Sequence, residues 1–266
     1  MQPLLTIAVR AARQAGDLAL RSLNRLHQLD VRSKGLNDFV TEVDLLAEQE
    51  IITTIRKSYP DHSFLAEERG RSAGDDEFLW IVDPLDGTTN FMHGFPQFSV
   101  SVALQRRGRL EQAVIYDPLR QELFTASRGD GAYLDGRRIR VSKQATLQGA
   151  LIGTGFPYRN NLHWLDPYMQ MLRTVIQQTS GVRRAGSAAL DLAYVAAGRL
   201  DGFWELGLKP WDIAAGALLI IEAGGLVGTL TGTERWEEGH IVVGTPKIYS
   251  ALLEAIAPHV PEDLRQ

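Results

Sequence analysis

The feature that most constrains the fold is a series of short β-prone segments that follow one another with no helical pattern between them. From Phe78 onward they read "FLWIV", "FSVSVAL", "QAVIY", "ELFTA", "AYL" and "RIRV". Turn signals such as Asp117-Pro118 and Asp135-Gly136 separate them. Strands that are joined by such short turns pair antiparallel. The pattern therefore predicts an antiparallel meander in the middle of the chain.

A helical pattern precedes this meander and an alternating pattern follows it. Residues 4–26 and 42–58 carry apolar side chains at helical spacing, which predicts two amphipathic helices. After residue 150, strands are expected at 150–155, 200–206 and 240–244, and helices after Asp166-Pro167, at 187–198, at 211–225 and from Pro246. We therefore expect a boundary near residues 145 to 150. It would divide an N-terminal α+β lobe (1–147) from a C-terminal α/β lobe (148–266), packed as one compact unit.

Composition and charge narrow the class of protein. A chain of 266 residues has ample core for two closely packed lobes. The net charge of -4 argues against direct nucleic-acid binding, and the absence of cysteine excludes thiolate chemistry and favours a reducing cytoplasm. The longest uncharged apolar run, "IAAGALLII", is far shorter than the ~20 residues needed to cross a bilayer. We expect a soluble, cytoplasmic protein with no membrane segment.

The stretch "WIVDPLDGTTNF" places two acids directly behind a buried strand. Asp83 is expected where the apolar strand leaves the core, and Asp86 follows three residues later. Two carboxylates that lie so close repel each other unless a cation lies between them, so this spacing indicates a metal site. Pro84 has no N–H group and fixes the turn, which makes the Leu85 carbonyl available as a further oxygen ligand.

The residues that follow the two acids suit an anion. Gly87 allows the backbone to come close to a ligand, and the N–H groups of Gly87, Thr88 and Thr89 are expected to form an anion-binding nest at the start of a helix. The alternative is an Asp- and Gly-rich turn that caps a helix for structural reasons alone. That reading suits an isolated Asp-Gly-Thr, whereas the full "DPLDGTTNF" after a buried strand is more specific.

Other acidic residues have a structural and a functional interpretation. Glu67 and Glu68 in "FLAEERG" are either further ligands or an exposed acidic loop, which is the preferred reading for that segment alone. Asp212 is expected in the first turn of a helix, which it would stabilise in either case. In the segment "KGLNDFVTEVD", the spacing of Thr41 and Asp44 indicates a helix-capping pair, and Lys34 and Asp38 are expected to be solvated loop charges.

Several common sites are excluded. The six histidines show no paired ligand spacing and thiols are absent, so zinc is disfavoured and an all-oxygen site indicates Mg²⁺, or Mn²⁺ in its place. The chain contains neither the P-loop pattern nor the three-glycine dinucleotide fingerprint. Nucleotide-dependent chemistry of those two kinds is therefore not expected.

Taken together, these segments resemble the inositol monophosphatase family, and the resemblance runs along nearly the whole chain. Its elements occur in order as "KGLNDFVTEVD", "AEERG", "WIVDPLDGTTNF", "GSAALDLAYVAAGRLDGFWELG" and "WDIAAGALLIIEAGG". The amino-acid sequences of the first and fourth segments are similar to those of the bacterial SuhB-like branch. The resemblance implies an α+β fold, a layered αβαβα sandwich of the sugar-phosphatase type. It also implies a lithium-sensitive, Mg²⁺-dependent phosphomonoesterase that holds two or three ions and forms a homodimer.

The resemblance also assigns roles to individual residues. It implies that the metal ligands are Glu67, Asp83, the Leu85 carbonyl, Asp86 and Asp212, with Glu68 as an outer ligand through water. It implies that Glu67, Asp44 and Thr88 are catalytic, the last two orienting and activating the attacking water. Substrate contacts are implied for Asp86, Gly87, Thr88, Ala188, Glu205 and Asp212.

Three functions remain open at this point. The first is hydrolysis of inositol 1-phosphate and related polyol monophosphates. The second is the same chemistry on another small phosphate ester, such as fructose 1,6-bisphosphate, histidinol phosphate or a 3′-phosphonucleotide. The third is an accessory role in ribosomal-RNA transcription antitermination, with antitermination factors or RNA polymerase as partners. Arg183 and Arg184 in "GVRRAGSAAL" are candidates for that surface or for a dimer contact, and a structural turn is the alternative.

Overall fold

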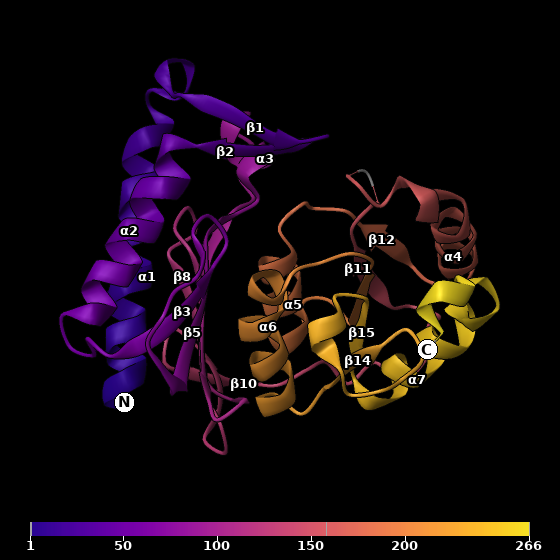
Figure 1. Ribbon diagram of the computed structural model, residues 1–266. Helices are drawn as coiled ribbons and strands as arrows, with labels where there is room; N and C mark the ends of the chain where they lie inside the picture. The colour runs from indigo at the N-terminus through magenta and orange to yellow at the C-terminus, as the bar shows by residue number, and fades with distance from the viewer. Residues whose placement is uncertain (1, 158, 266) are drawn as a thin grey trace.

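The computed structural model describes residues 2–157 and 159–265, which form five layers that alternate between helices and sheets (Figure 1). Two N-terminal helices cover one face of the first sheet, two helices separate the first sheet from the second, and two more cover the far face of the second (Figure 1). The expected αβαβα sandwich is therefore confirmed. No helix among the described residues combines the length and the apolar character needed to cross a membrane.

The outer N-terminal layer consists of α1 (Pro3–Leu23) and α2 (Glu42–Arg56). Both were expected, although α1 ends earlier than residue 26 and a short 3₁₀ turn, Leu26–Gln28, follows it. Between the helices lies a hairpin of β1 (Val31–Gly35) and β2 (Asp38–Thr41) that the sequence analysis missed. Its first strand is exposed along its whole length, so it has none of the apolar alternation that reveals a half-buried strand.

The first sheet has eight strands, and six of them form the predicted antiparallel meander. In spatial order they are β10 (Arg137–Ile139), β9 (Gly131–Leu134), β8 (Glu122–Ser127), β7 (Arg109–Asp117), β6 (Ser99–Arg106), β5 (Asp75–Asp86), β3 (His62–Ala66) and β4 (Gly70–Arg71). β3 pairs parallel to β5, and neither β3 nor β4 was predicted. Both are short, and β3 follows the second helix, where the helical pattern has ended and no strand pattern has yet begun.

Strand β5 carries an irregularity that shapes the site. It continues through Asp86, beyond the apolar segment that predicted it. Asp83 lies opposite Ser101 of β6 and Asp86 lies opposite Ser99, so three steps on β5 match two steps on β6. Residues three apart in a regular strand face opposite sides, but the extra residue of this bulge returns the second acid to the side of the first.

The second sheet is built from residues after 150 and has five strands. Its spatial order is β12 (Gly181–Arg183), β11 (Leu151–Thr154), β13 (Gly202–Glu205), β15 (Ile241–Gly244) and β14 (Leu226–Thr229). The sequence predicted β11, β13 and β15 but not the two edge strands, which are short and only partly buried. The outer helices α4 (Leu165–Gln178) and α7 (Pro246–Ile256) pack on its far face.

Helices α5 (Ala188–Ala196) and α6 (Pro210–Glu222) fill the space between the two sheets. Most of their residues are buried because they face a sheet on both sides, which explains their almost continuous apolar sequences. Their side chains share one core with β5–β8 residues such as Ile115 and Phe124. The strands of the first sheet end before residue 145 and those of the second begin after residue 150. The division of the chain into two lobes at this point stays a prediction.

Candidate metal centre and active site

Three carboxylates converge where the first sheet meets the central helices. Asp83 and Asp86 come from the bulged end of β5, and Asp212 comes from the first turn of α6. One oxygen of each lies within 4.8 Å of the others. Asp83 is only 2% exposed and Asp86 only 9%, so water screens their charges poorly. The predicted acidic pair is thus joined by a third acid from the other half of the chain.

The pKa values of this three-carboxylate cluster reflect its crowding. Burial, followed by the charges of Glu67, Asp86 and Asp212, raises the pKa of Asp83 well above its ordinary value. Burial raises the pKa of Asp86 to about 6, although the Ser187 hydroxyl and the Ala189 N–H donate hydrogen bonds to it. Burial and then the charge of Asp86 raise the pKa of Asp212 to about 7. A divalent cation would relieve the repulsion among these hard oxygen ligands, so the residues present fit such an ion.

Asp212 also has the structural role expected of it. Its Oδ2 accepts a hydrogen bond of 2.7 Å from the Lys209 N–H, which satisfies a donor at the start of α6. Its negative charge lies at the positive end of the helix dipole. The capping interpretation and the functional one are therefore compatible at this residue.

Glu67 and Glu68 do not form an exposed acidic loop, so the reading preferred for that segment alone is wrong. Their side chains are only 15% and 4% exposed, and both carboxylates contact the ammonium of Lys34, at 2.9 and 2.7 Å. Lys34 is therefore not the solvated charge that was expected. Burial lowers the pKa of Lys34, but the two carboxylates outweigh that effect and raise it overall. Burial raises the pKa of Glu68 to about 7.

Thr41, Asp44 and Thr88 form a hydrogen-bonded chain beside the cluster. Asp44 Oδ2 accepts from the Thr41 N–H at 2.8 Å, and the Thr41 hydroxyl caps α2, which confirms the predicted capping box. Asp44 Oδ1 accepts from the Thr88 hydroxyl at 2.9 Å, and that hydroxyl also lies 3.1 Å from the Leu85 carbonyl. Burial raises the pKa of Asp44 to about 6, against the hydrogen bonds from both threonines.

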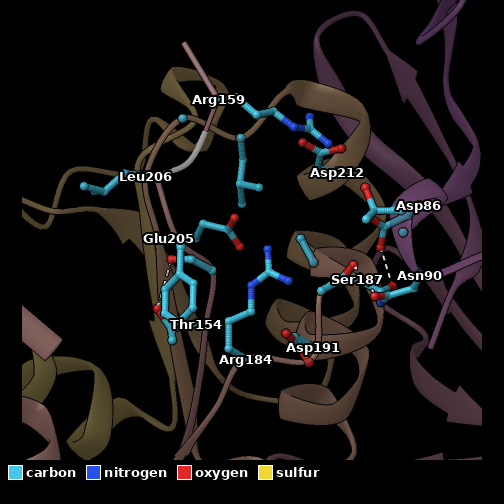
Figure 2. Close-up of a pocket in the computed structure, with 18 of the residues that line it drawn as sticks. Asp86, Asn90, Thr154, Arg159, Arg184, Ser187, Asp191, Glu205, Leu206 and Asp212 are labelled. Atoms are coloured by element: carbon cyan, nitrogen blue, oxygen red, sulfur yellow. Dashed lines mark hydrogen bonds between the residues drawn. The ribbon is translucent and has the colours of Figure 1, made fainter. Parts of the chain in front are cut away.

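A polar pocket opens in front of these groups. Figure 2 shows the carboxylates of Asp86, Asp212 and Glu205 turned toward the same space, with the Arg184 guanidinium reaching into it. Among the other residues that line it are Gly87, Thr88, Asn90, Thr154, Gly155, Phe156, Arg159, Asn161, Ser187, Ala188, Asp191 and Leu206. All the substrate contacts implied by the resemblance therefore line one pocket.

Two glycines make room in this pocket. Gly87 has a φ of +94°, and a Cβ there would lie 2.9 Å from the Gln97 carbonyl oxygen. Gly155 stands beside Glu205, and a Cβ on it would lie 2.0 Å from the Glu205 carboxyl group. Any larger residue at position 155 would displace that carboxylate. Burial and then the charge of Asp212 raise the pKa of Glu205 to about 8.

Some pocket residues were missed by sequence reasoning. Asp191 is 2% exposed in the first turn of α5, three residues after Ala188 and so on the same helical face, which was a usable signal. Arg184 was assigned to an outer surface or a turn, but it lines the pocket with its guanidinium 5.3 Å from the centre of the Phe156 ring. Arg159 lies in a loop that carries no recognisable pattern, and Gly155 was expected within the strand at 150–155 but follows the end of β11.

The raised pKa values predict how a divalent ion affects stability. A carboxylic acid whose pKa is raised in the folded state stabilises that state below its unfolded pKa, and this contribution is lost as the pH rises through the folded value. The free energy of unfolding should therefore lose the contributions of Asp86 and Asp212 between about pH 4 and pH 7 when metals are chelated. A bound ion removes that loss, because deprotonated carboxylates bind it.

The measurement is the melting temperature across this pH range, in chelator and in Mg²⁺. The difference between the two curves should widen as the pH rises. Curves that stay parallel would show that the acids do not hold the ion.

Comparison with known proteins identifies the group to which these residues belong. The family model described as "Inositol monophosphatase family" matches residues 1–264. The chain is 57% identical over 271 residues to the Pseudomonas aeruginosa protein named Nus factor SuhB, with 100% of both chains covered. The structure matches that of the extragenic suppressor protein suhB from Bartonella henselae with a TM-score of 0.94 and 43% identity, covering 97% of this chain and 100% of that one.

A second solved structure carries the family's enzymatic name. It is the inositol monophosphatase from Anabaena (Nostoc) sp. PCC 7120, matched with a TM-score of 0.82 and 38% identity over 97% of each chain. The similarity to all these proteins extends over essentially the whole chain and includes every segment that contributes to the pocket. The chain belongs to the inositol monophosphatase family, in its SuhB-like branch.

Proposed function

We propose that the protein is a Mg²⁺-dependent phosphomonoesterase that hydrolyses inositol 1-phosphate and related polyol monophosphates to polyol and phosphate. The observation that carries this proposal is the buried cluster of Asp83, Asp86 and Asp212, which faces a pocket with Glu205 on another wall. Hard oxygen ligands suit Mg²⁺, with Mn²⁺ as a substitute. Phosphate monoesters need stabilisation of negative charge above all, which such a site provides.

The proposed metal site includes further ligands besides the three clustered aspartates. Asp83, Asp86 and Asp212 would hold one part of a site for two or three ions, and Glu67 with the Leu85 carbonyl would complete it, with Glu68 behind them. The influence of Glu67 on the pKa of Asp83 supports its proximity. Bound Mg²⁺ supplies the positive charge that acidifies a water molecule and stabilises the phosphate oxygens.

The remaining catalytic work falls to Asp44 and Thr88. The Thr88 hydroxyl carries one proton and has two acceptors within reach, Asp44 Oδ1 and the Leu85 carbonyl. When it donates to Asp44, its lone pairs can accept a hydrogen bond from a water molecule, and a proton taken from that water would be balanced by the hydroxyl proton passing to Asp44. We propose that this chain orients the attacking water and draws its proton away.

The substrate would lie between the cluster and Glu205. The backbone N–H groups of Gly87 and Thr88 would donate to the phosphate, and Asp86 and Glu205 would accept from hydroxyl groups of the polyol. Asp212 and Ala188 complete this wall of the pocket. The room that Gly155 leaves beside Glu205 supports the placement of this carboxylate as a substrate contact.

The experiment that tests this function is a phosphate-release assay of the purified protein with Mg²⁺, over a panel of esters. Inositol 1-phosphate is expected to be hydrolysed faster than fructose 1,6-bisphosphate, histidinol phosphate and a 3′-phosphonucleotide, and added lithium should inhibit. A higher kcat/KM for another ester of the panel would identify that ester, and not inositol 1-phosphate, as the preferred substrate. No release from any ester would contradict the enzymatic function.

Substitution of Gly155 by alanine should separate substrate binding from chemistry. The new methyl group would push the Glu205 carboxylate out of position and raise KM for inositol 1-phosphate about 10-fold or more, the cost of one lost charged hydrogen bond. Mg²⁺ binding, measured by calorimetry, should be unchanged because the cluster lies across the pocket. An unchanged KM would show that Glu205 does not contact the polyol.

A second candidate function is an accessory role in transcription antitermination. The observation that favours it is the name Nus factor carried by relatives that cover the whole chain, together with the exposed position of Arg184 at the pocket rim. Antitermination factors or RNA polymerase would be the partners, and a homodimer of this chain the binding unit. A pull-down from cell extract, with Arg184→Ala as the control, tests the role. Failure to capture transcription proteins specifically would count against it.

A further inference from the structure

Glu48 is a fully buried carboxylate that does not line the pocket. It lies on α2, one helical turn after Asp44, and its side chain is fully buried. An ionised carboxylate in such a position costs several kcal/mol unless hydrogen bonds and charges compensate for it. Burial accordingly raises the pKa of Glu48. A leucine would fill the same space at no such cost, so the contacts of this carboxylate indicate its role.

Those contacts are with the segment that carries Glu67 and Glu68. Glu48 Oε2 accepts a hydrogen bond of 2.8 Å from the Glu68 N–H, and its Oε1 lies 3.4 Å from Arg69 Nε. On the opposite side, the Glu67 N–H donates to the Val82 carbonyl at 3.1 Å. The segment after β3 is thus attached to β5 on one side and to α2 on the other.

The position of Glu48 on α2 connects two parts of the site. Residues four apart lie on one face of a helix, so Asp44 and Glu48 point in the same direction. The first holds the Thr88 hydroxyl and the second holds the backbone beside the Glu67 carboxylate. Because α2 begins at a satisfied capping box, its first turns are well defined.

We propose that Glu48 is a positioning residue that fixes Glu67 and Glu68 for metal binding, an inference that rests on the proposed function. With its acceptor present, the backbone at Glu68 is held in place, and both carboxylates keep their contacts with Lys34, where the charge of Glu67 also acts on Asp83. Without it, the Glu68 N–H loses its partner and the segment becomes free to move. Groups that orient metal ligands typically contribute 10- to 100-fold to metal affinity.

The experiment measures metal binding without catalysis, by titration calorimetry with Mg²⁺ and, in parallel, Mn²⁺. Glu48→Met removes the acceptor and the buried charge but retains an unbranched side chain of similar size, so the fold should be preserved. Glu48→Gln retains an acceptor oxygen for the Glu68 N–H. Glu50→Ala, at a half-exposed position of the same helix, is the matched control.

We expect Glu48→Met to weaken binding of the ion about 10- to 100-fold and Glu48→Gln to restore most of the affinity, with Glu50→Ala unchanged. Wild-type affinity in Glu48→Met would overturn the inference and leave the proposed function intact. So would equal losses in Glu48→Met and Glu48→Gln, since the acceptor would then be irrelevant. If the unsubstituted protein binds neither metal, the proposed function fails and the inference fails with it.

Discussion

Replacement of Asp83 by asparagine is expected to remove nearly all phosphate release from inositol 1-phosphate, a decrease of about 10³-fold, while the protein stays folded. Asp83 is the most buried member of the cluster and would contact ions on both sides. A lost contribution of about 4 kcal/mol to transition-state charge stabilisation corresponds to a decrease of about 10³-fold in kcat/KM. The Leu85 N–H donates to Asp83 Oδ1 at 2.9 Å, and an asparagine oxygen can accept the same bond.

The same substitution should make the metal-free protein more stable. Burial and three neighbouring acids destabilise the ionised Asp83, and a neutral amide removes that cost. The melting temperature in chelator should therefore rise, by roughly 2–4 °C for each kcal/mol gained. Mg²⁺ should then add little further stability.

A suitable control is Asp117→Asn, which alters a fully buried aspartate that lies outside the pocket. Asp117 accepts from the Leu119 and Arg120 N–H groups and pairs with the Arg120 guanidinium at 2.8 Å. This variant should lose stability and keep its activity, the opposite of Asp83→Asn. Undiminished turnover in Asp83→Asn would refute the role of Asp83 as a metal ligand.

Substitution of Asp44 by asparagine is expected to lower kcat about 10²- to 10⁴-fold, the range for loss of general acid–base assistance. Asp44 Oδ2 accepts from two donors of Thr41, so the amide oxygen of an asparagine must take that place. Its NH₂ group would then face Thr88 and donate to the hydroxyl instead of accepting from it. Thr88 could no longer pass a proton toward Asp44.

Two variants separate this effect from helix capping. Thr41→Val removes the hydroxyl that caps α2 and should reduce the free energy of unfolding by about 1 kcal/mol, with kcat changed far less. Thr88→Ala should reproduce the loss in kcat without affecting the cap. Calorimetry should show that all three variants still bind Mg²⁺. A normal kcat in Asp44→Asn would exclude the proposed path of the proton.

The sequence predicted the elements with strong periodicity and missed those without it. The meander and the two central helices were expected because their apolar patterns are long and have a single period. The hairpin around Lys34 was missed because its exposed strand has no alternation to detect. Edge strands β12 and β14 were missed because three or four partly buried residues carry too little signal.

The site residues likewise divide into those that a local sequence pattern predicts and those that depend on distant parts of the chain. Asp83 and Asp86 were visible because acids directly after a buried strand are unusual, and capping by Thr41 and Asp44 was visible because it is local. The contact of Lys34 with Glu67 and Glu68 depends on how a distant hairpin folds back, which no local pattern encodes. The requirement for glycine at position 155 likewise exists only once Glu205 has been brought beside it.

The bulge in β5 makes the number of residues between the two aspartates as important as their identity. Deletion of Pro84 or Leu85 would let β5 pair with β6 without interruption, and the sheet would gain regularity. Asp83 and Asp86 would then stand two residues apart and would stay on one face. The backbone between them would join the regular ladder, however, and the contact of the Leu85 carbonyl with the Thr88 hydroxyl would be lost. Shortening this strand should therefore harm the site even though both aspartates are retained, because a regular strand would not present this carbonyl beside Thr88.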